Sequence, residues 1–317
     1  MTAISLPRRI PRPHRVRLTP LARREARWGL LFISPWVIGF LLFTLYPMLA
    51  SLAFSFTNIN LDQTEPLRFV GLKNYERLIN DKQTWESLAV SLKFAVLWLP
   101  FTIATPFLVA LLLNSPRLRG TTIFRVLFFL PYVVPFVAGL VIWQGMLAGQ
   151  TGWVNEFLST IGIANPPDWL QDPQWIYPGL VFIGVWGIGA GVIVNLAGLK
   201  SVPTELYDAA KIDGAGWWGQ LRNVTLPMMS PVIFYTLILG MVEVMQYFLP
   251  AIVLKNGTGE PGGSTYFFNL YIYKQFFGFH NMSYGATLAW LLFLITLGIT
   301  LVLFAGAKRW VYYAGER

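Results

Sequence analysis

The chain has 317 residues, of which 55% are hydrophobic and only 12% are charged, whereas soluble domains average about a quarter charged residues. Repeated apolar stretches long enough to cross a bilayer exclude a soluble protein and indicate an all-α polytopic membrane protein. The formal net charge of +9 does not indicate nucleic-acid binding, because eight arginines fall within the first 28 residues, beside the first apolar stretch, where topology signals occur. The absence of cysteine excludes disulfides, thiol nucleophiles and cysteine-ligated metals.

Three regions follow one another along the chain. Residues 1–28 form a basic arm, which we expect to be disordered at the cytoplasmic surface, residues 29–307 form the transmembrane domain, and residues 308–317 form a cytoplasmic tail. Six apolar segments have the length of a membrane-spanning helix. They run approximately over residues 28–56, 88–113, 122–148, 175–199, 229–254 and 284–307.

The distribution of basic residues predicts the orientation of these six helices. Both termini, residues 114–125 and the loop 200–228 fall on one side, which carries 17 Lys and Arg, whereas the other side carries six. Because basic segments stay in the cytoplasm, both termini and the 200–228 loop are predicted to be cytoplasmic.

The 200–228 loop has the pattern of two short helices joined by a turn. Ser201 can cap a first helix, and Glu205 lies near the positive end of its dipole. Asp213-Gly214 is a helix stop, because glycine tolerates a left-handed backbone. A second short helix is expected before Pro227. One interpretation is a surface hairpin lying on lipid headgroups; the other is a docking site for another protein.

The spacing of residues in this loop resembles the "EAA" loop of ABC importer permeases. DAA at 208–210 is followed after three residues by Gly214, and after nine more by VTLP at 224–227, with Asp in place of the family's Glu and Val in place of its Ile. A pattern of this length and spacing is far more specific than an isolated short motif. FVGLKNY, FRVLFFLPYVVP and WLQDP resemble other segments of the carbohydrate-uptake branch, and the similarity covers roughly residues 30–306.

The resemblance implies a type I ABC importer permease fold in a bacterial-type inner membrane, with a cytoplasmic coupling helix that docks on an ATPase. It implies a second, related permease subunit, two ATP-binding subunits that hold ATP and magnesium, and an extracellular solute-binding protein that delivers a sugar or oligosaccharide. This chain itself is expected to bind no cofactor. The residues that the resemblance assigns to ATPase coupling are Glu205, Asp208, Ala209, Ala210, Asp213, Gly214, Leu226 and Pro227.

Polar residues within the apolar segments are the candidates for a solute path, because exposing an ionisable group to lipid is costly. Glu243, Gln246, Tyr247 and Pro250 have the spacing of one helix face, which predicts a polar face on the fifth span that hydrogen-bonds solute hydroxyls. The alternative is a helix–helix contact in which Glu243 pairs with a partner subunit. Weaker candidates for the path are Trp143, Trp186 and Asn195; for each tryptophan the competing interpretation is a membrane-belt or packing role.

No enzymatic function is indicated. The chain lacks a G-x-x-x-x-G-K-[ST] phosphate-binding loop, HExxH and GxSxG, and its two histidines, His14 and His280, are far apart, so no metal site is expected. Three rival functions remain: a permease for glycerol phosphate or another polar solute, a stand-alone secondary carrier or channel, and a membrane-embedded enzyme. A carrier would not need a docking loop, and an enzyme would need a catalytic constellation that the sequence does not show.

Overall fold

The computed structural model describes residues 19–62, 66–115 and 118–312, and these residues are mostly helical. The described β structure is one isolated bridge between Thr57 and Phe69. Most of the basic arm, including His14, lies outside the described residues. The chain divides into two compact units, residues 1–53 and residues 54–317.

The described part of the first unit, residues 19–53, belongs to one apolar helix. Helix α1 (Pro20–Phe40) continues through a π-helical turn at Leu41–Leu45 into α2 (Tyr46–Ser55). Together they span 36 residues, and the most apolar window of this helix has no buried residue. An exposed apolar helix of this length requires a bilayer or another protein around it.

The helix starts earlier than the sequence suggested. The hydroxyl of Thr19 accepts a hydrogen bond from the backbone N–H of Ala22 at 3.3 Å, and Pro20 lies in the first turn, where its missing N–H costs nothing. The expectation of disorder is therefore wrong for residues 20–28, which are helical. A threonine–proline start signal outweighed the high charge of this segment.

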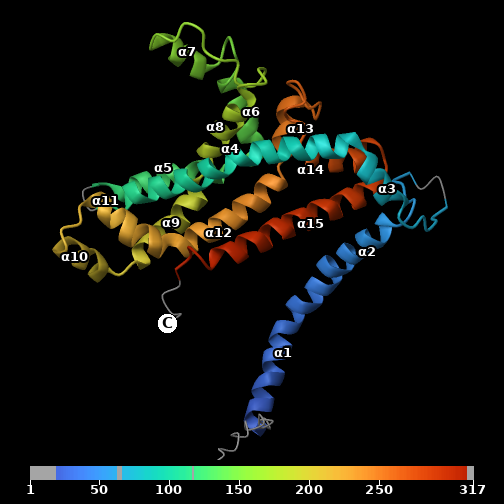
Figure 1. The fold of residues 1–317 in the computed structure, drawn as a ribbon, viewed down its shortest axis with the longest axis horizontal. Helices are drawn as coiled ribbons and strands as arrows, with labels where there is room; N and C mark the ends of the chain where they lie inside the picture. Colours follow the sequence, from blue (N-terminus) through green and yellow to red (C-terminus); the bar gives the residue numbers. More distant parts are fainter. Residues whose placement is uncertain (1–18, 63–65, 116–117, 313–317) are drawn as a thin grey trace, which may run out of the picture. The chain divides into compact units, whose positions relative to one another are not determined.

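The second unit is built around α4 (Lys82–Leu113), which packs along α8, α9, α12 and α14. Figure 1 shows α4, α12 and α15 lying beside one another. The other helices of this unit are α3 (Lys73–Asn80), α5 (Thr121–Val133), α6 (Phe136–Met146), α7 (Trp153–Thr160), α8 (Ile176–Trp186), α9 (Gly189–Ser201), α10 (Thr204–Ile212), α11 (Trp217–Gln220), α12 (Leu226–Met245), α13 (Leu249–Lys255), α14 (Phe268–Tyr273) and α15 (Met282–Ala307), with π-helical turns at Leu221–Thr225 and Lys274–Gly278.

Two of the expected spans are broken. The axes of α5 and α6 differ by 100° across a break that contains Pro135, which has no N–H to continue a helix. The axes of α8 and α9 differ by 60° across Gly187 and Ile188. The described residues therefore contain four continuous helices that could cross a membrane, or up to six spans if each bent pair counts as one.

An aromatic cluster forms the centre of the larger core. Phe94 of α4 is fully buried, and its ring centroid lies 4.8–5.4 Å from the rings of Trp98, Tyr177, Tyr247 and Phe267. Each aromatic pair of this kind contributes about 0.5–1.5 kcal/mol beyond its buried area. The cluster fixes the position of Tyr247, which borders a pocket described below.

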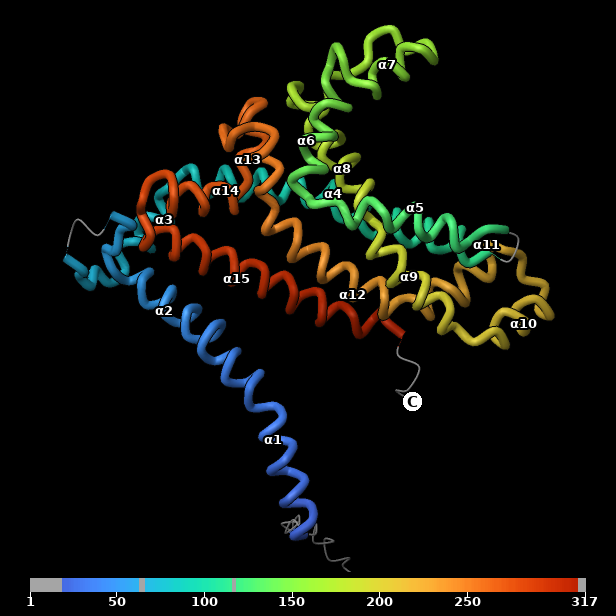
Figure 2. Tube along the Cα trace, turned by 180° about the vertical axis from the view of Figure 1, so that it is seen from behind, coloured from blue at the N-terminus to red at the C-terminus, as the bar shows by residue number. Residues whose placement is uncertain are grey.

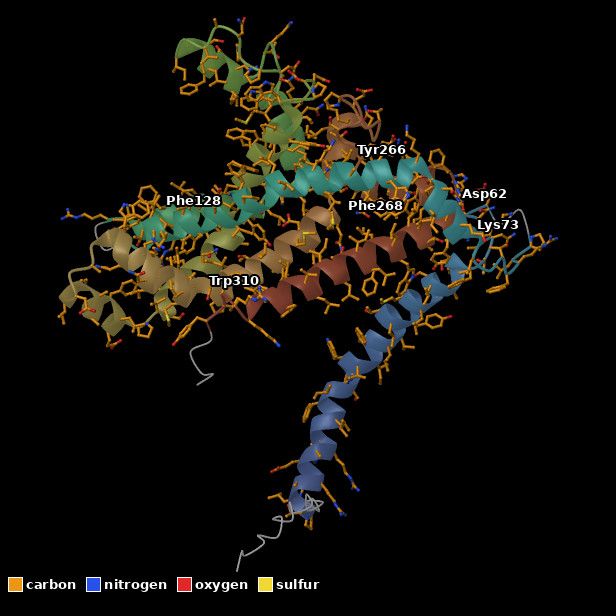
Figure 3. The ribbon with its side chains drawn as sticks, in the orientation of Figure 1. Asp62, Lys73, Phe128, Tyr266, Phe268 and Trp310 are labelled. Atoms are coloured by element: carbon orange, nitrogen blue, oxygen red, sulfur yellow. The ribbon has the colours of Figure 1, made fainter. Side chains whose placement is uncertain are left out.

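The second unit has two distinguishable ends. Figure 2 shows α10 and α11 at one end, together with the start of α12 and the end of α9. We call this the hairpin end. The opposite end, here the far end, contains α3, the start of α4 and the start of α15. Trp310, which follows α15 and is labelled in Figure 3, packs against Phe234 of α12 with the ring centroids 5.8 Å apart. Helix α15 therefore runs from the far end back toward the hairpin end.

Candidate functional site

A helical hairpin, residues 202–216, connects α9 to α11 and contains α10. The expected cap at Ser201 is wrong: α9 extends to Ser201, whose hydroxyl donates a hydrogen bond back to the carbonyl of Gly198 at 2.8 Å. Serine in the last turn of a helix readily bonds backward in this way. Pro203 occupies the N-cap position of α10 instead, and no side chain caps it.

The turn of the hairpin lies where the sequence predicts it. Helix α10 ends at Ile212, and Gly214 follows with a φ of +79°, a left-handed conformation that favours glycine. The N–H of Gly214 donates to the carbonyl of Lys211 at 3.0 Å, and the N–H of Ala215 donates to Ala210 at 2.8 Å. These bonds satisfy the last carbonyls of α10 and make a tight turn.

The second half of the loop differs from the expected separate short helix. One continuous helix runs from Trp217 to Met245, passing through α11, the π-helical turn Leu221–Thr225 and α12. The π-helical turn precedes Pro227, which cannot donate a backbone hydrogen bond inside a helix. Tyr207 links the hairpin to this helix through a hydrogen bond of 3.1 Å between its hydroxyl and that of Thr225.

The residues assigned to coupling are mostly accessible. Glu205, Asp208, Ala209, Asp213 and Gly214 are all exposed on the hairpin. The other three are Ala210, which is half-buried on α10, and Leu226 and Pro227, which begin α12. The structure thus brings six of the eight residues together on one helix and its turn.

A groove of about 850 Å³ lies beside the hairpin. It is lined by residues of α10 and α11 and by the ends of α4 and α9, including Tyr207, Asp208 and Trp217. The Asp208 carboxylate and the Lys211 ammonium are 2.9 Å apart, but both side chains are more than half exposed, so this ion pair contributes little stability. Ile212, the last residue of α10, is 87% exposed.

A second concave site has a volume of about 240 Å³. All four residues of the expected polar face line it, namely Glu243, Gln246, Tyr247 and Pro250. Sequence reasoning missed the other three residues of the lining, because they are apolar and Phe136 is distant in the chain; they are Phe136, Phe248 and Leu249. We call this concave site the polar pocket.

The reason that these residues meet is not the one expected. They do not share one helix face, because α12 ends at Met245 and α13 begins at Leu249. At this break the N–H of Gln246 is shared between the carbonyls of Val242 and Glu243, and the side-chain amide of Asn269 donates to the Gln246 carbonyl at 2.8 Å. Irregular backbone at membrane depth requires such partners or a water-filled cavity.

The three weaker candidates lie outside the polar pocket. Trp143 and Trp186 contact each other edge to face, with ring centroids 5.9 Å apart, and Trp143 belongs to the core. Asn195 is buried and donates to the carbonyl of Gly191 in its own helix at 2.9 Å. The Trp143 indole nitrogen and the Asn195 amide oxygen are both buried and have no hydrogen-bond partner among the described residues, so a path role for these candidates stays a prediction.

A polar cluster at the far end was also missed. The Asp81 carboxylate accepts hydrogen bonds from the hydroxyls of Tyr271 and Tyr284, both at 2.6 Å, and from Thr84 at 2.8 Å. Burial raises the pKa of Asp81, but these hydrogen bonds, with one from the backbone of Gln83, outweigh burial and hold the pKa below its ordinary value. The cluster ties the start of α4 to α14 and α15.

Lys255 forms the second missed contact. Its side chain is buried, and its ammonium donates a hydrogen bond to the side-chain oxygen of Gln171 at 2.8 Å. Burial lowers the pKa of Lys255, and the nearby carboxylates of Asp168 and Glu260 partly oppose this effect. The contact joins the WLQDP segment to the end of α13. No group of three or more potential metal ligands occurs among the described residues.

Comparison with known proteins agrees with this architecture. Residues 102–309 match the family described as "binding-protein-dependent transport system inner membrane component". The chain is 34% identical to the probable ABC transporter permease protein YesP of Bacillus subtilis (strain 168), covering 93% of this chain and 94% of that protein. It is 35% identical to the lactose transport system permease protein LacF of Rhizobium radiobacter, over 89% of this chain and 94% of that protein.

The fold is also found in a solved structure. A bacterial ABC transporter involved in the import of the acidic polysaccharide alginate matches with a TM-score of 0.76 and 24% identity, covering 92% of this chain and 99% of the matching chain. The family match extends over most of the described helices, from α4 to the residues after α15. The chain therefore belongs to the family of inner-membrane components of binding-protein-dependent transport systems, which are ABC transporter permeases rather than enzymes.

Proposed function

We propose that this protein is the permease subunit of an ATP-driven importer that takes up a sugar or oligosaccharide delivered by an extracellular binding protein. The proposed coupling to ATP hydrolysis is supported by the exposed hairpin, whose sequence has the EAA-type spacing. The sugar assignment is supported by relatives named for lactose and for trehalose and maltose, which are 35% and 30% identical to this chain.

In this proposal the hairpin is the coupling helix, and two ATPase subunits that hold ATP and magnesium dock on it and on its counterpart. The eight coupling residues contact one ATPase directly. The chain spans the membrane six times, with both termini, the hairpin and the 308–317 tail in the cytoplasm. A second, related permease subunit completes the solute path.

The continuous helix from Trp217 to Met245 supports a direct transmission route. It begins at the hairpin and ends at the polar pocket, so the hairpin and Gln246 are connected by one helix with no intervening loop. Tyr207 couples α10 to this helix through Thr225. For ATP to drive the change, the ATPase must contact the hairpin differently in the two states.

A substitution on the exposed face of α10 tests the docking. Ala209 is exposed and helical, so Ala209→Trp adds bulk without backbone strain. We expect recovery of the ATPase with the purified permease to fall about tenfold or more, because filling the centre of an interface excludes the partner. The matched control is Ser159→Trp on the exposed face of helix α7, which should retain the ATPase. Equal ATPase recovery with both variants would refute the coupling role.

Uptake measurements test the substrate class. Cells lacking the gene and complemented with it should take up one or more labelled sugars from a panel of mono- and oligosaccharides, and Ala209→Trp should abolish that uptake. Glycerol phosphate is included in the panel. Uptake of glycerol phosphate alone would replace the sugar assignment, and uptake that persists without an ATPase would indicate a secondary carrier.

A further inference from the structure

The polar pocket contains one acidic side chain. Of its seven lining residues, Glu243 is the only ionisable group besides the phenol of Tyr247, and no lining residue is basic. The Glu243 side chain is exposed on the described chain rather than enclosed in its core. The ion pairs of the described residues all lie elsewhere, so no basic nitrogen in this part of the chain lies within 4.0 Å of the Glu243 carboxylate.

The position of the Glu243 carboxylate within the membrane region indicates that it faces water or a polar partner. An acidic side chain within a membrane-spanning helix lies toward a water-filled cavity or a polar partner rather than toward lipid. The pocket lies where α12 ends before Gln246, and Phe136, the first residue of α6 in the bent pair α5–α6, contributes to its lining. Broken helices border solute sites in secondary transporters, where irregular backbone lines the path.

From these observations we propose that Glu243 is a specificity-determining residue that makes the polar pocket select against anionic solutes, such as uronic acids and phosphate esters, in favour of neutral polyols. The inference rests on the proposed function, in which this pocket is part of the solute path. A neutral sugar can donate hydroxyl hydrogen bonds to the carboxylate and to Gln246. An anionic solute would instead meet a carboxylate that forms no ion pair within the described chain.

The cysteine-free sequence permits a test that does not require the natural solute. Gln246→Cys is placed in the wild-type and in the Glu243→Gln background, and the assembled importer in membranes is treated with a cationic trimethylammonium or an anionic sulfonate methanethiosulfonate reagent. The quantity measured is the ratio of the cationic to the anionic reaction rate. We expect this ratio to be about tenfold higher in the wild-type background than in the Glu243→Gln background, because a nearby charge attracts one reagent and repels the other.

Two controls keep the result interpretable. Ser159→Cys on α7 should give a rate ratio that does not depend on the Glu243→Gln substitution, since it lies on a different helix outside the pocket. Leu249→Cys, also in the lining, replaces Gln246→Cys if the latter fails to assemble with its partner subunits. Equal ratios in the two backgrounds would overturn the proposal, because Glu243 would then be neutralised by a proton or by a partner. Cysteines unreactive toward both reagents would also overturn it, because the pocket would be closed to water.

The outcome is separable from that of the proposed function. Labelling requires neither transport nor ATP hydrolysis. If the ratio of the cationic to the anionic reaction rate depended on Glu243 but no sugar were taken up, the charge of the pocket would be established and the assignment as a sugar importer would be wrong. Unchanged ratios together with ATPase-dependent sugar uptake would leave the importer assignment standing and remove the charge selection.

Discussion

At the scale of single residues, Asp81 shows how one carboxylate organises the far end. Two tyrosine hydroxyls and a threonine hydroxyl converge on it from α14, α15 and the first turn of α4. Burial together with the hydrogen bond to Asp81 raises the pKa of Tyr271, so this phenol remains a donor at any physiological pH. Arg77 lies over the ring of Tyr284 at 3.9 Å and adds a cation–π contact.

Asp81→Asn is expected to destabilise the protein by about 1.5–3 kcal/mol, because hydrogen bonds to a charged acceptor are among the stronger ones. The measurement is the free energy or midpoint of unfolding in detergent. Glu86→Gln is the matched control: it removes an exposed ion pair with Lys82 and should cost no more than about 1 kcal/mol. Equal losses for both variants would mean that the Asp81 cluster is not a specific stabilising element.

The hydrogen bonds of Asp81 also predict that the stability of the protein depends on pH. Because the folded-state pKa of Asp81 is lowered, its stabilisation is fully present above the ordinary aspartate value of about 4 and is lost as the pH falls through the folded-state pKa. The unfolding midpoint of the wild type should therefore drop more steeply on acidification than that of Asp81→Asn. Parallel pH profiles for the two proteins would contradict this assignment.

At the scale of elements, close helix contacts decide how the broken spans pack. A Cβ atom at Gly189 would lie 2.6 Å from the carbonyl oxygen of Phe128 and 2.9 Å from the Cα of Phe129, so α9 can approach the backbone of α5 only with glycine at this position. Phe128 on α5 is marked in Figure 3. This contact holds the half-span α9, which leads directly into the hairpin, against its neighbour.

Gly189→Ala should therefore destabilise the protein by about 1–3 kcal/mol, the usual cost of overpacking, since backbone atoms cannot move aside as a flexible side chain can. Thermal unfolding in detergent measures the effect. Gly298→Ala on α15 is the control, because no described atom lies within 4 Å of its added Cβ; it should be neutral or slightly stabilising, as alanine favours a helix. Equal effects at both positions would exclude the close contact as the cause.

At the scale of the whole molecule, the asymmetry of basic residues predicts on which side of the membrane each connection lies. Asp213 in the hairpin belongs to the predicted cytoplasmic side, whereas Ser159 in α7 belongs to the side with few basic residues. Both are exposed, and single cysteines at these positions can be labelled without background. A membrane-impermeant maleimide should label Ser159→Cys in intact cells and Asp213→Cys only after permeabilisation. Labelling of both from outside would require a different number of spans between them, and labelling of Asp213→Cys alone in intact cells would require the opposite orientation.

The sequence alone determined the class, the family and the main elements of this protein. Hydrophobic length, basic-residue distribution and motif spacing are local or cumulative properties, so the apolar helices, the helix stop at Gly214 and the permease family could be predicted from them. Periodicity also grouped Glu243, Gln246 and Tyr247 correctly, although it assumed an unbroken helix.

Only the tertiary structure decided where the helices break and what meets at the breaks. The end of α12 at Met245, its continuity back to Trp217 and the position of Phe136 beside the polar pocket depend on packing between distant segments. The Asp81 bonds join residues 190 and 203 positions apart. A periodic pattern contains no information about such partners, because the free energy that selects them comes from burial and hydrogen bonding between elements that the sequence keeps separate.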